Sequence, residues 1–452
     1  MPRAGRRVGH WLADGRREAA AGRADGRASW HGGPMVDDWR RTEADLFDGI
    51  LRRTHLSRPA DVARLVVEEA QSALGAGEVV LYWVNREQTE LVPLPVAGFR
   101  TPAPLSLDGS LAGRAFTTST ILTTDSAPGR VRVLVPVVDG TDRLGVVELD
   151  LPQAASPTAG ADSEQRLRVL ERLGHAVALA LVSKRAYGDD LELVQRSRPM
   201  DLGAELLWSA LPPMTYANEG LVIAAMLEPA YENGGDAYDY AVNEDGVHLA
   251  IFDGLGHGLV AARLSTFVLA AGRHARRSGA GLAKAYVMVD EAVAAEFGAD
   301  RFVTGILARL DPATGVLEWV DAGHPAPLVL RDGRVVKQLE VEPATPFGAP
   351  GPFGDVQVGR EQLEPGDVVV LYTDGVVEAR RPDGSFLDVE GLVEFVERES
   401  ASRAGAPEIL RRFRRTLLDD AGTVLGDDAT VLLVAWRTGA EDALVPQTVL
   451  DD

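Results

Sequence analysis

Cysteine is absent from all 452 residues of this chain. Its absence excludes disulfide bonds, thiolate nucleophiles, and zinc or iron–sulfur centres held by cysteine. Any metal ion bound here must therefore take oxygen or imidazole ligands.

Long hydrophobic runs and an excess of basic residues are also missing. The best apolar stretch, HAVALALVS, is about half of the ~20 residues that a bilayer-spanning helix needs. The N-terminus lacks the hydrophobic segment of a signal peptide. Lys and Arg number 46 against 67 Asp and Glu, a formal net charge of −21, which argues against nucleic-acid binding through a basic surface. These features predict a soluble, cytoplasmic protein without nucleic-acid or membrane partners.

The chain is long enough for two or three domains. Hydrophobic residues make up 46% and charged residues 25%, as in globular proteins. The first 34 residues differ, with seven Arg against three acids, and we interpret residues 1–38 as a disordered basic tail. Alternatively, Met35 is the true start and residues 1–34 are a translation-start artefact. Residues 438–452 predict an acidic C-terminal tail.

Residues 39–152 predict an α+β module. Its expected elements are two helices, two strands, a loop with a short helix and a strand, and a hairpin, over residues 37–56, 59–76, 78–85, 90–96, 105–125 and 130–151. This order resembles a GAF domain, with a PAS-like sensor as the alternative. The likeness is carried by PADVARLVVEEAQSALGAGEVVLYWVN, SLAGRAF and RVLVPVVDGTDRLGVVELD. It implies a sensor domain whose small-molecule or protein ligand stays open.

Residues 153–213 predict a linker followed by signalling helices. The linker begins with the Pro/Ala/Ser-rich stretch PQAASPTAGADS, which is typical of a loop. An apolar stripe at helical spacing follows, formed by Leu167, Leu170, Leu173, Val177 and Leu181. Such a stripe indicates a packing or dimer seam, and hence a homodimer through the linker helices. The alternative is a helix packed on the sensor domain alone.

Residues 214–437 contain repeated apolar β-runs with paired blocks of helix between them. The strand candidates are GLVIAAMLEP, GVHLAIFDG, DRFVTGILARLD, GVLEWVDAGH, APLVLRDG, DVVVLYTDG and ATVLLVAW. Most of them are almost continuously apolar, as buried strands can be. Helices in paired blocks favour a layered α+β sandwich over an alternating parallel fold.

Asp-Gly occurs ten times in the sequence, and most copies need no explanation beyond a favoured turn. Two copies differ in context. Asp253 and Asp374 each end an apolar strand run, VHLAIF and DVVVLYT, before a glycine. A carboxylate at the end of a buried strand is rigidly held and partly desolvated, which suits metal binding or acid–base chemistry.

Asp236 in GGDAYDY and the pair Asp427-Asp428 in GDDATVLLVAW extend this pattern. Each of these acidic sites borders an apolar strand and adjoins glycine, which lets carbonyl groups and water approach a cation. With no cysteine and no clustered histidine, the cation would be hard, Mg²⁺ or Mn²⁺. Carboxylates from separated strands suit a two-metal centre. On spacing alone, four unrelated turns remain the alternative.

Five motifs are similar, in order and spacing, to the SpoIIE-like branch of the PPM metal-dependent protein phosphatases. They are EPAYENGGDAYDY, FDGLGHG, DAGHPAPLVL, LYTDGVVEAR and GDDATVLLV. The resemblance implies a four-layer α-β-β-α sandwich over residues 214–437, with two divalent cations at one edge. It implies that Asp253 bridges both cations and that the Gly254 carbonyl is a ligand. Asp374 and Asp427 would hold the second cation, and Asp236 would bind directly or through water.

Other polar residues near these motifs are weaker candidates. His257 in GLGHG could protonate the leaving hydroxyl as a general acid. His324 in AGHP is more simply a residue that fixes a turn by hydrogen bonding. Asp239 and Asp428 could support the ligands or be solvated acids.

Two departures from the family concern the substrate. Many members carry an aromatic residue where this chain has Ala237, and no Arg precedes Asp236 to bind phosphate. These departures leave the ligand set intact and place substrate docking at that edge in doubt.

The resemblance implies a bacterial protein serine/threonine phosphatase that is controlled by its sensor domain. Its substrate would be a regulatory phosphoprotein, by analogy an anti-sigma-factor antagonist in a partner-switching pathway. The rival hypothesis is a non-catalytic signalling scaffold, against which the intact aspartates argue. Hydrolysis of a small phosphomonoester is a third hypothesis, for which the sequence has no P-loop or base-binding signature.

Overall fold

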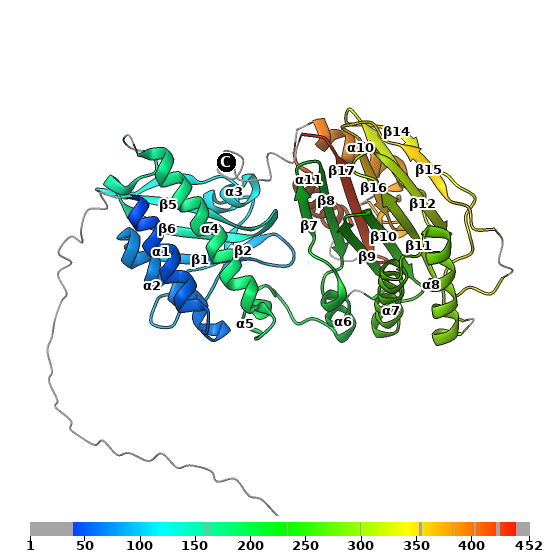
Figure 1. Cartoon of the computed structure of the whole chain (residues 1–452), viewed down its shortest axis with the longest axis horizontal. Coiled ribbons are helices and arrows are strands. Elements are labelled where there is room, and N and C mark those ends of the chain that lie inside the picture. Colours follow the sequence, from blue (N-terminus) through cyan, green and yellow to red (C-terminus); the bar gives the residue numbers. More distant parts are fainter. Residues whose placement is uncertain are drawn as a thin grey trace, which may run out of the picture.

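The computed structural model describes residues 39–439 except 159, 161, 233, 299, 352–354, 382, 402–403 and 422–424. The predicted basic tail, the Met35 start and nearly all of the C-terminal tail lie outside the described residues. Figure 1 shows an N-terminal α+β unit beside a C-terminal sandwich, with short helices between them. Within the described ranges, every helix is too short or too polar to traverse a lipid bilayer.

A six-stranded antiparallel sheet with the order β3-β2-β1-β6-β5-β4 is the centre of the N-terminal unit. Its strands are β1 (Val79–Val84), β2 (Glu90–Pro93), β3 (Leu105–Ser106), β4 (Leu122–Ala127), β5 (Arg130–Asp139) and β6 (Asp142–Pro152). Helices α1 (Trp39–Thr54), α2 (Val62–Leu74) and α4 (Ser163–Arg185) share one core with the sheet. Helix α3 (Leu111–Thr118) shares a second core on the other face. The helices and strands expected from the sequence are therefore present in order.

The apolar stripe of α4 packs into the core of the N-terminal unit. Leu170, Leu173 and Val177 are 0% exposed and Leu181 is 3% exposed, whereas Leu167 is 36% exposed. The stripe therefore serves packing within the chain, as the second interpretation expected, and most of it is not available to another subunit. The helical region then breaks into α5 (Asp190–Val194) and α6 (Leu202–Ala210).

Two antiparallel sheets form the C-terminal unit. The five-stranded sheet has the order β15-β12-β11-β10-β9 and the six-stranded sheet has the order β14-β13-β16-β17-β8-β7. The first comprises β9 (Asp236–Asn243), β10 (Gly246–Gly254), β11 (Val303–Leu310), β12 (Val316–Ala322) and β15 (Gly359–Gln362). The second comprises β7 (Thr215–Asn218), β8 (Leu221–Glu228), β13 (Leu328–Arg331), β14 (Arg334–Gln338), β16 (Val368–Tyr372) and β17 (Ala429–Trp436).

Helices cover the outer faces of both sheets. Helices α7 (Gly258–Arg277) and α8 (Leu282–Phe297) pack with the five-stranded sheet, and the same hydrophobic core reaches the inward side chains of β8 and β17. Helices α10 (Asp388–Ala401) and α11 (Ala406–Ala421) pack with the outward side chains of the six-stranded sheet. The layers therefore follow the order α-β-β-α, which confirms the predicted fold class.

In the C-terminal unit, the strands outside the seven predicted ones are the four edge strands, β7, β9, β14 and β15. An edge strand pairs on one side only and needs less apolar sequence than a strand buried on both sides. Strand β9 is the one that matters for the site, because Asp236 is its first residue.

Candidate functional site

The pairing of β9 with β10 brings the first two predicted ligands together. Asp236 lies opposite Asp253 in the antiparallel register, and the Asp245-Gly246 turn connects the two strands. The Gly254 amide donates a hydrogen bond to the Gly235 carbonyl over 2.8 Å. Two carboxylates therefore leave neighbouring strands at the same end of one sheet.

The third predicted ligand comes from the other sheet. Asp374 is the first residue of the short helix α9 (Asp374–Val377), and Thr373 is its N-cap. The Thr373 hydroxyl donates to Asp236 Oδ2 over 2.7 Å and accepts from the Thr430 amide over 2.9 Å. This buried hydroxyl links β9 of one sheet to β16 and β17 of the other, and it fixes Asp374 close to Asp236.

The two adjacent aspartates before β17 have different environments. Asp428 is 8% exposed, and its Oδ2 accepts hydrogen bonds from the amides of Gly234 and Gly235 over 3.1 and 2.6 Å. Asp427 is exposed and accepts only the amide of Asp428 among the hydrogen bonds that the structure describes, over 2.9 Å. Asp428 therefore holds the loop before Asp236, while Asp427 remains the better ligand candidate.

Glycine is required where the backbone segments meet. A Cβ on Gly235 would lie 2.8 Å from the Gly254 carbonyl oxygen and 3.3 Å from Asp428 Oδ2. A Cβ on Gly375 would lie 1.9 Å from the Asp428 carbonyl oxygen. The close approach of these segments explains why glycines accompany the aspartates in the sequence.

The gathered carboxylates raise one another's pKa values. Burial, followed by the charges of Asp374 and Asp427, raises the pKa of Asp253 to about 7. Burial, followed by the charges of Asp253 and Asp428, raises the pKa of Asp236 well above its ordinary value. A bound divalent cation would remove this repulsion, because it favours the ionised form of each acid.

The donor set fits a hard cation, since it consists of carboxylates and a backbone carbonyl. Within the described part of the chain, however, no three Asp, Glu or His side chains are grouped so that they could already hold a metal ion. Binding would therefore require rotation of side chains, for which Asp427 is exposed and Asp253 and Asp374 are partly exposed.

The two histidines of the sequence motifs occupy different places. His257 is exposed and precedes α7, three residues after Gly254, and its side chain makes no capping hydrogen bond. His324 is buried, with Nδ1 2.9 Å from Thr304 Oγ1, and its amide donates to Asp321 Oδ1 over 2.7 Å. Burial lowers the pKa of His324 to about 3, so the ring is neutral and makes the turn-fixing contacts that were expected.

Two further sequence interpretations are settled by packing. Asp239 is 3% exposed and pairs with Arg273 and Arg276 of α7 at 2.7 and 2.9 Å, so it ties β9 to that helix. Ala237 is 0% exposed and belongs to the central core. The expectation that Ala237 bears on substrate docking is wrong, because the residue faces the interior.

Sequence reasoning missed Thr373, the amides of Gly234 and Gly235, and Arg301. The Nη1 atom of Arg301 lies 3.6 Å from the place that a Cβ would take on Gly256, and the Leu255 amide donates to the Phe302 carbonyl over 3.2 Å. Arg301 has no ion-pair partner among the described residues. Arg301 lies two residues before β11, the strand that pairs with β10, and this basic residue near a strand end was the signal that could have identified it.

Comparisons with known proteins find similarity over the C-terminal unit. Residues 243–437 match the family model described as Stage II sporulation protein E (SpoIIE). The chain is 25% identical over 236 residues to the phosphoserine phosphatase RsbU of Bacillus subtilis, covering 52% of this chain and 69% of RsbU. It is 26% identical over 134 residues to protein IcfG of Synechocystis, covering 29% of this chain and 20% of IcfG.

Solved structures are similar to about half of the chain. The crystal structure of the RsbU and RsbW domains of a Mycobacterium tuberculosis protein is 30% identical and has a TM-score of 0.41. It covers 48% of this chain and 62% of that one. The phosphatase domain with a regulatory fragment of SpoIIE from Bacillus subtilis is 20% identical and has a TM-score of 0.40. It covers 48% of this chain and 65% of that one.

Proposed function

We propose that this protein hydrolyses phosphoserine or phosphothreonine on a regulatory protein, because residues 243–437 match the SpoIIE family model. One observation carries the proposal: Asp236 and Asp253 from one sheet meet Asp374 and Asp427, which border strands of the other. A cluster of like charges that raises its own pKa values is costly to the fold, which favours a functional reason for it. The name of the relative RsbU, a phosphoserine phosphatase, supports the substrate class.

Two divalent cations, Mn²⁺ or Mg²⁺, are the cofactors that we propose. Asp236, Asp253, the Gly254 carbonyl, Asp374 and Asp427 would hold them. When bound, such ions supply a water of lowered pKa and neutralise charge on the phosphoryl oxygens. The chain contributes the positions of the ligands, which the bond from Thr373 to Asp236 and the amides that bind Asp428 restrain.

Two side chains beside the ligands would act on the substrate itself. His257 is exposed on the loop that follows Gly254, where it could donate a proton to the leaving hydroxyl. The guanidinium of Arg301 lies against Gly256 of the same loop, and a guanidinium binds phosphate oxygens with two parallel hydrogen bonds. We propose that Arg301 supplies the phosphate-binding cation that the sequence lacks before Asp236.

The N-terminal unit is proposed to be a GAF-like sensor over residues 39–152, joined by residues 153–213 to the phosphatase domain over residues 214–437. The substrate is proposed to be an anti-sigma-factor antagonist of a partner-switching pathway. A homodimer through the linker helices also remains a proposal. It would have to use exposed apolar residues such as Leu179, Leu193 and Leu202, at 63%, 61% and 65% exposure, because the main stripe of α4 is buried.

One assay separates an enzyme from a non-catalytic scaffold. We expect Mn²⁺-dependent release of phosphate from p-nitrophenyl phosphate and from a phosphoserine protein. Asp253→Ala and Asp374→Ala should each lose activity by orders of magnitude, whereas Asp332→Ala, in an exposed turn far from the ligands, should retain it. A wild-type protein that is inert with metal present, both as the full chain and without the N-terminal unit, would support the scaffold.

A further inference from the structure

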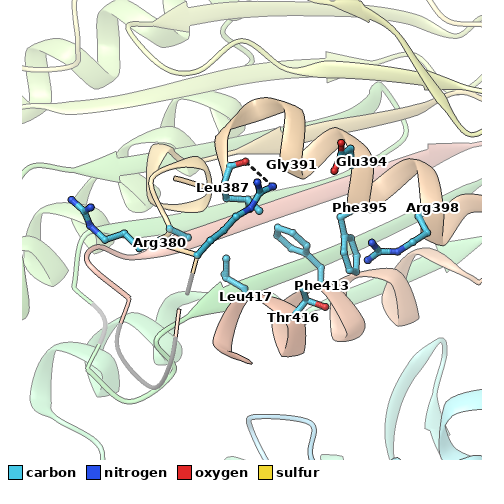
Figure 2. Close-up of a pocket in the computed structure, with 11 residues that line it drawn as sticks. Arg380, Leu387, Gly391, Glu394, Phe395, Arg398, Phe413, Thr416 and Leu417 are labelled. Atoms are coloured by element: carbon cyan, nitrogen blue, oxygen red, sulfur yellow. Dashed lines mark hydrogen bonds between the residues drawn. The ribbon is translucent and has the colours of Figure 1, made fainter. Parts of the chain in front are cut away.

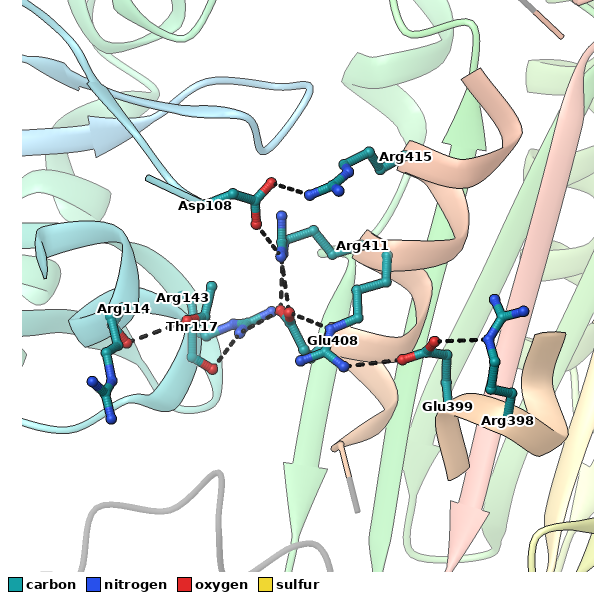
Figure 3. A network of polar contacts seen from close by, with 10 residues as sticks. Asp108, Arg114, Thr117, Arg143, Arg398, Glu399, Glu408, Arg411 and Arg415 are labelled. Carbon is teal, nitrogen blue, oxygen red and sulfur yellow. Dashed lines mark hydrogen bonds and ion pairs between the residues drawn. The ribbon is translucent and has the colours of Figure 1, made fainter. Parts of the chain in front are cut away.

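Helix α11 of the sandwich is in direct contact with the N-terminal unit (Figure 3). Asp108, in the loop between β3 and α3, accepts hydrogen bonds from Arg411 over 2.8 Å and from Arg415 over 2.7 Å. Arg143 of β6 lies 3.7 Å from Glu408, measured from Nη1 to Oε2. Residues from two separate parts of the N-terminal unit therefore bind one helix.

The contact is more than a pair of surface charges. The side chains of Arg411, Arg143 and Glu408 are 5%, 6% and 11% exposed, whereas that of Asp108 is 40% exposed. Within α11, Arg411 also donates to Glu408 over 2.9 Å. Ion pairs that are largely removed from water interact more strongly than exposed pairs, which contribute little. The N-terminal unit therefore contacts α11 partly through side chains that are largely removed from water.

The same helix also contacts the end of β8, the strand that precedes the Gly234–Asp236 loop. Arg414 forms a buried ion pair with Glu228, the last residue of β8. Glu228 lies opposite Ala429 in the sheet, the residue after Asp428, and its Oε2 accepts the Ala230 amide over 3.2 Å. This pair holds the start of the loop that leads to Gly234, Gly235 and Asp236.

A second contact connects α11 to the segment after Asp374. Phe413 and Leu417 of α11 line a small pocket with Leu387 and Gly391 (Figure 2). Leu387 donates its amide to the Ala379 carbonyl over 2.8 Å, which closes the segment that follows α9. Helix α11 thus contacts a residue that precedes Asp236 in the chain and residues that follow Asp374.

We infer that α11 couples the docking of the N-terminal unit to the order of the Gly234–Asp236 loop. When Asp108 holds Arg411 and Arg415, Arg414 holds Glu228, and the amides of Gly234 and Gly235 stay bonded to Asp428. When Asp108 no longer binds Arg411 and Arg415, α11 can shift, and the hydrogen bonds from the Gly234 and Gly235 amides to Asp428 weaken. This route is separate from the linker helices, and only its consequence for catalysis rests on the proposed function.

Hydrogen exchange on the metal-free full chain tests the coupling without any activity measurement. Asp108→Arg places a like charge beside Arg411 and Arg415. It should enlarge the radius of gyration in solution scattering and speed exchange at the Gly234 and Gly235 amides by roughly tenfold or more. The double variant Asp108→Arg/Arg415→Asp restores one ion pair and should reverse much of both effects. Arg415→Asp alone replaces the other member of this exposed ion pair and should have effects in the same direction as Asp108→Arg.

The matched control is Asp125→Arg, which makes the same charge change at an exposed position of β4. It should leave scattering and exchange unchanged. The inference is overturned if Asp108→Arg enlarges the radius of gyration but leaves hydrogen exchange at Gly234 and Gly235 unaltered. It is also overturned if Asp108→Arg does not separate the N-terminal unit from α11. An inert wild-type enzyme would remove the proposed function and leave this coupling standing.

Discussion

The hydroxyl of Thr373 donates a hydrogen bond to Asp236 Oδ2 over 2.7 Å, although 137 positions separate the two residues in the chain. Both residues are buried. The bond joins the end of a strand in one sheet to the start of a strand in the other, so it sets the distance between ligands that the two sheets contribute. We expect the site to be sensitive to this one hydroxyl.

Replacing that hydroxyl should weaken both the fold and metal binding. Thr373→Val keeps the shape of the side chain but leaves Asp236 Oδ2 and the Thr430 amide without this partner, which should cost about 1–3 kcal/mol in the free energy of unfolding. Mn²⁺ affinity should fall about 10–100-fold, as is typical when a group that orients a ligand is lost. Urea denaturation and Mn²⁺ titration measure the two effects. Thr373→Ser keeps the hydroxyl and should have a stability and an Mn²⁺ affinity near those of the wild type. Equal values for Thr373→Val and Thr373→Ser would contradict this role of the hydroxyl.

A methyl group on Gly235 should disrupt the site through the backbone. In Gly235→Ala the new Cβ would meet the Gly254 carbonyl at 2.8 Å, so one of two fixed segments must move. We expect loss of Mn²⁺ binding, measured by calorimetry, and a fall of about 1–3 kcal/mol in the free energy of unfolding. Gly281→Ala is the control, since a Cβ there meets no atom within 4 Å. Normal metal binding by Gly235→Ala would show that the loop is not tightly packed.

The stability of the metal-free protein should depend on pH through Asp253. Burial and then the charges of Asp374 and Asp427 raise its pKa from 3.8 to about 7, so the unfolded chain gives up this proton at lower pH than the folded one. The stability that this group contributes is present below about pH 4 and is lost as pH rises through about 7. Asp253→Asn removes the charge, and at pH 8 it should be more stable than the wild type by on the order of 1–3 kcal/mol.

Denaturation of both proteins in EDTA at pH 4 and pH 8 tests this expectation. The advantage of Asp253→Asn should largely disappear at pH 4, because the wild-type acid is then protonated in the folded state and about half protonated in the unfolded chain, whose pKa is 3.8. Added Mn²⁺ should stabilise only the wild type at pH 8. A difference between the two proteins that is the same at both pH values would rule out titration of Asp253 as its cause.

Arg301 should affect substrate binding more than metal binding. Arg301→Met removes the guanidinium near Gly256 and should raise KM for a phosphoserine protein about tenfold or more, with a smaller change in kcat. Arg301→Lys keeps the charge without the paired donors and should be intermediate. Inhibition by inorganic phosphate should weaken in parallel, while Mn²⁺ affinity stays unchanged. Arg360→Met, at the far edge of the same sheet, is the control, and an unchanged KM in Arg301→Met would remove the proposed role.

The strands buried on both sides could be predicted because their apolar runs are a direct consequence of that burial. Strand β17 is an example, since all of its residues from Ala429 to Trp436 are buried. The edge strand β9 could not be predicted in the same way. Its sequence DAYDYAVN mixes aspartate and tyrosine with small residues and has no continuous apolar run, and its pairing with β10 makes it a strand.

By itself, the sequence determined that the chemistry must use oxygen or imidazole ligands, and it marked Asp236, Asp253, Asp374 and the Asp427-Asp428 pair by their place at the ends of strands. Tertiary structure decided what each of them does. Asp428 binds backbone amides, whereas Asp427 is exposed. Ala237 faces the core, and α11 touches both the N-terminal unit and Glu228. These roles depend on register and packing between residues far apart in the chain, which local patterns do not record.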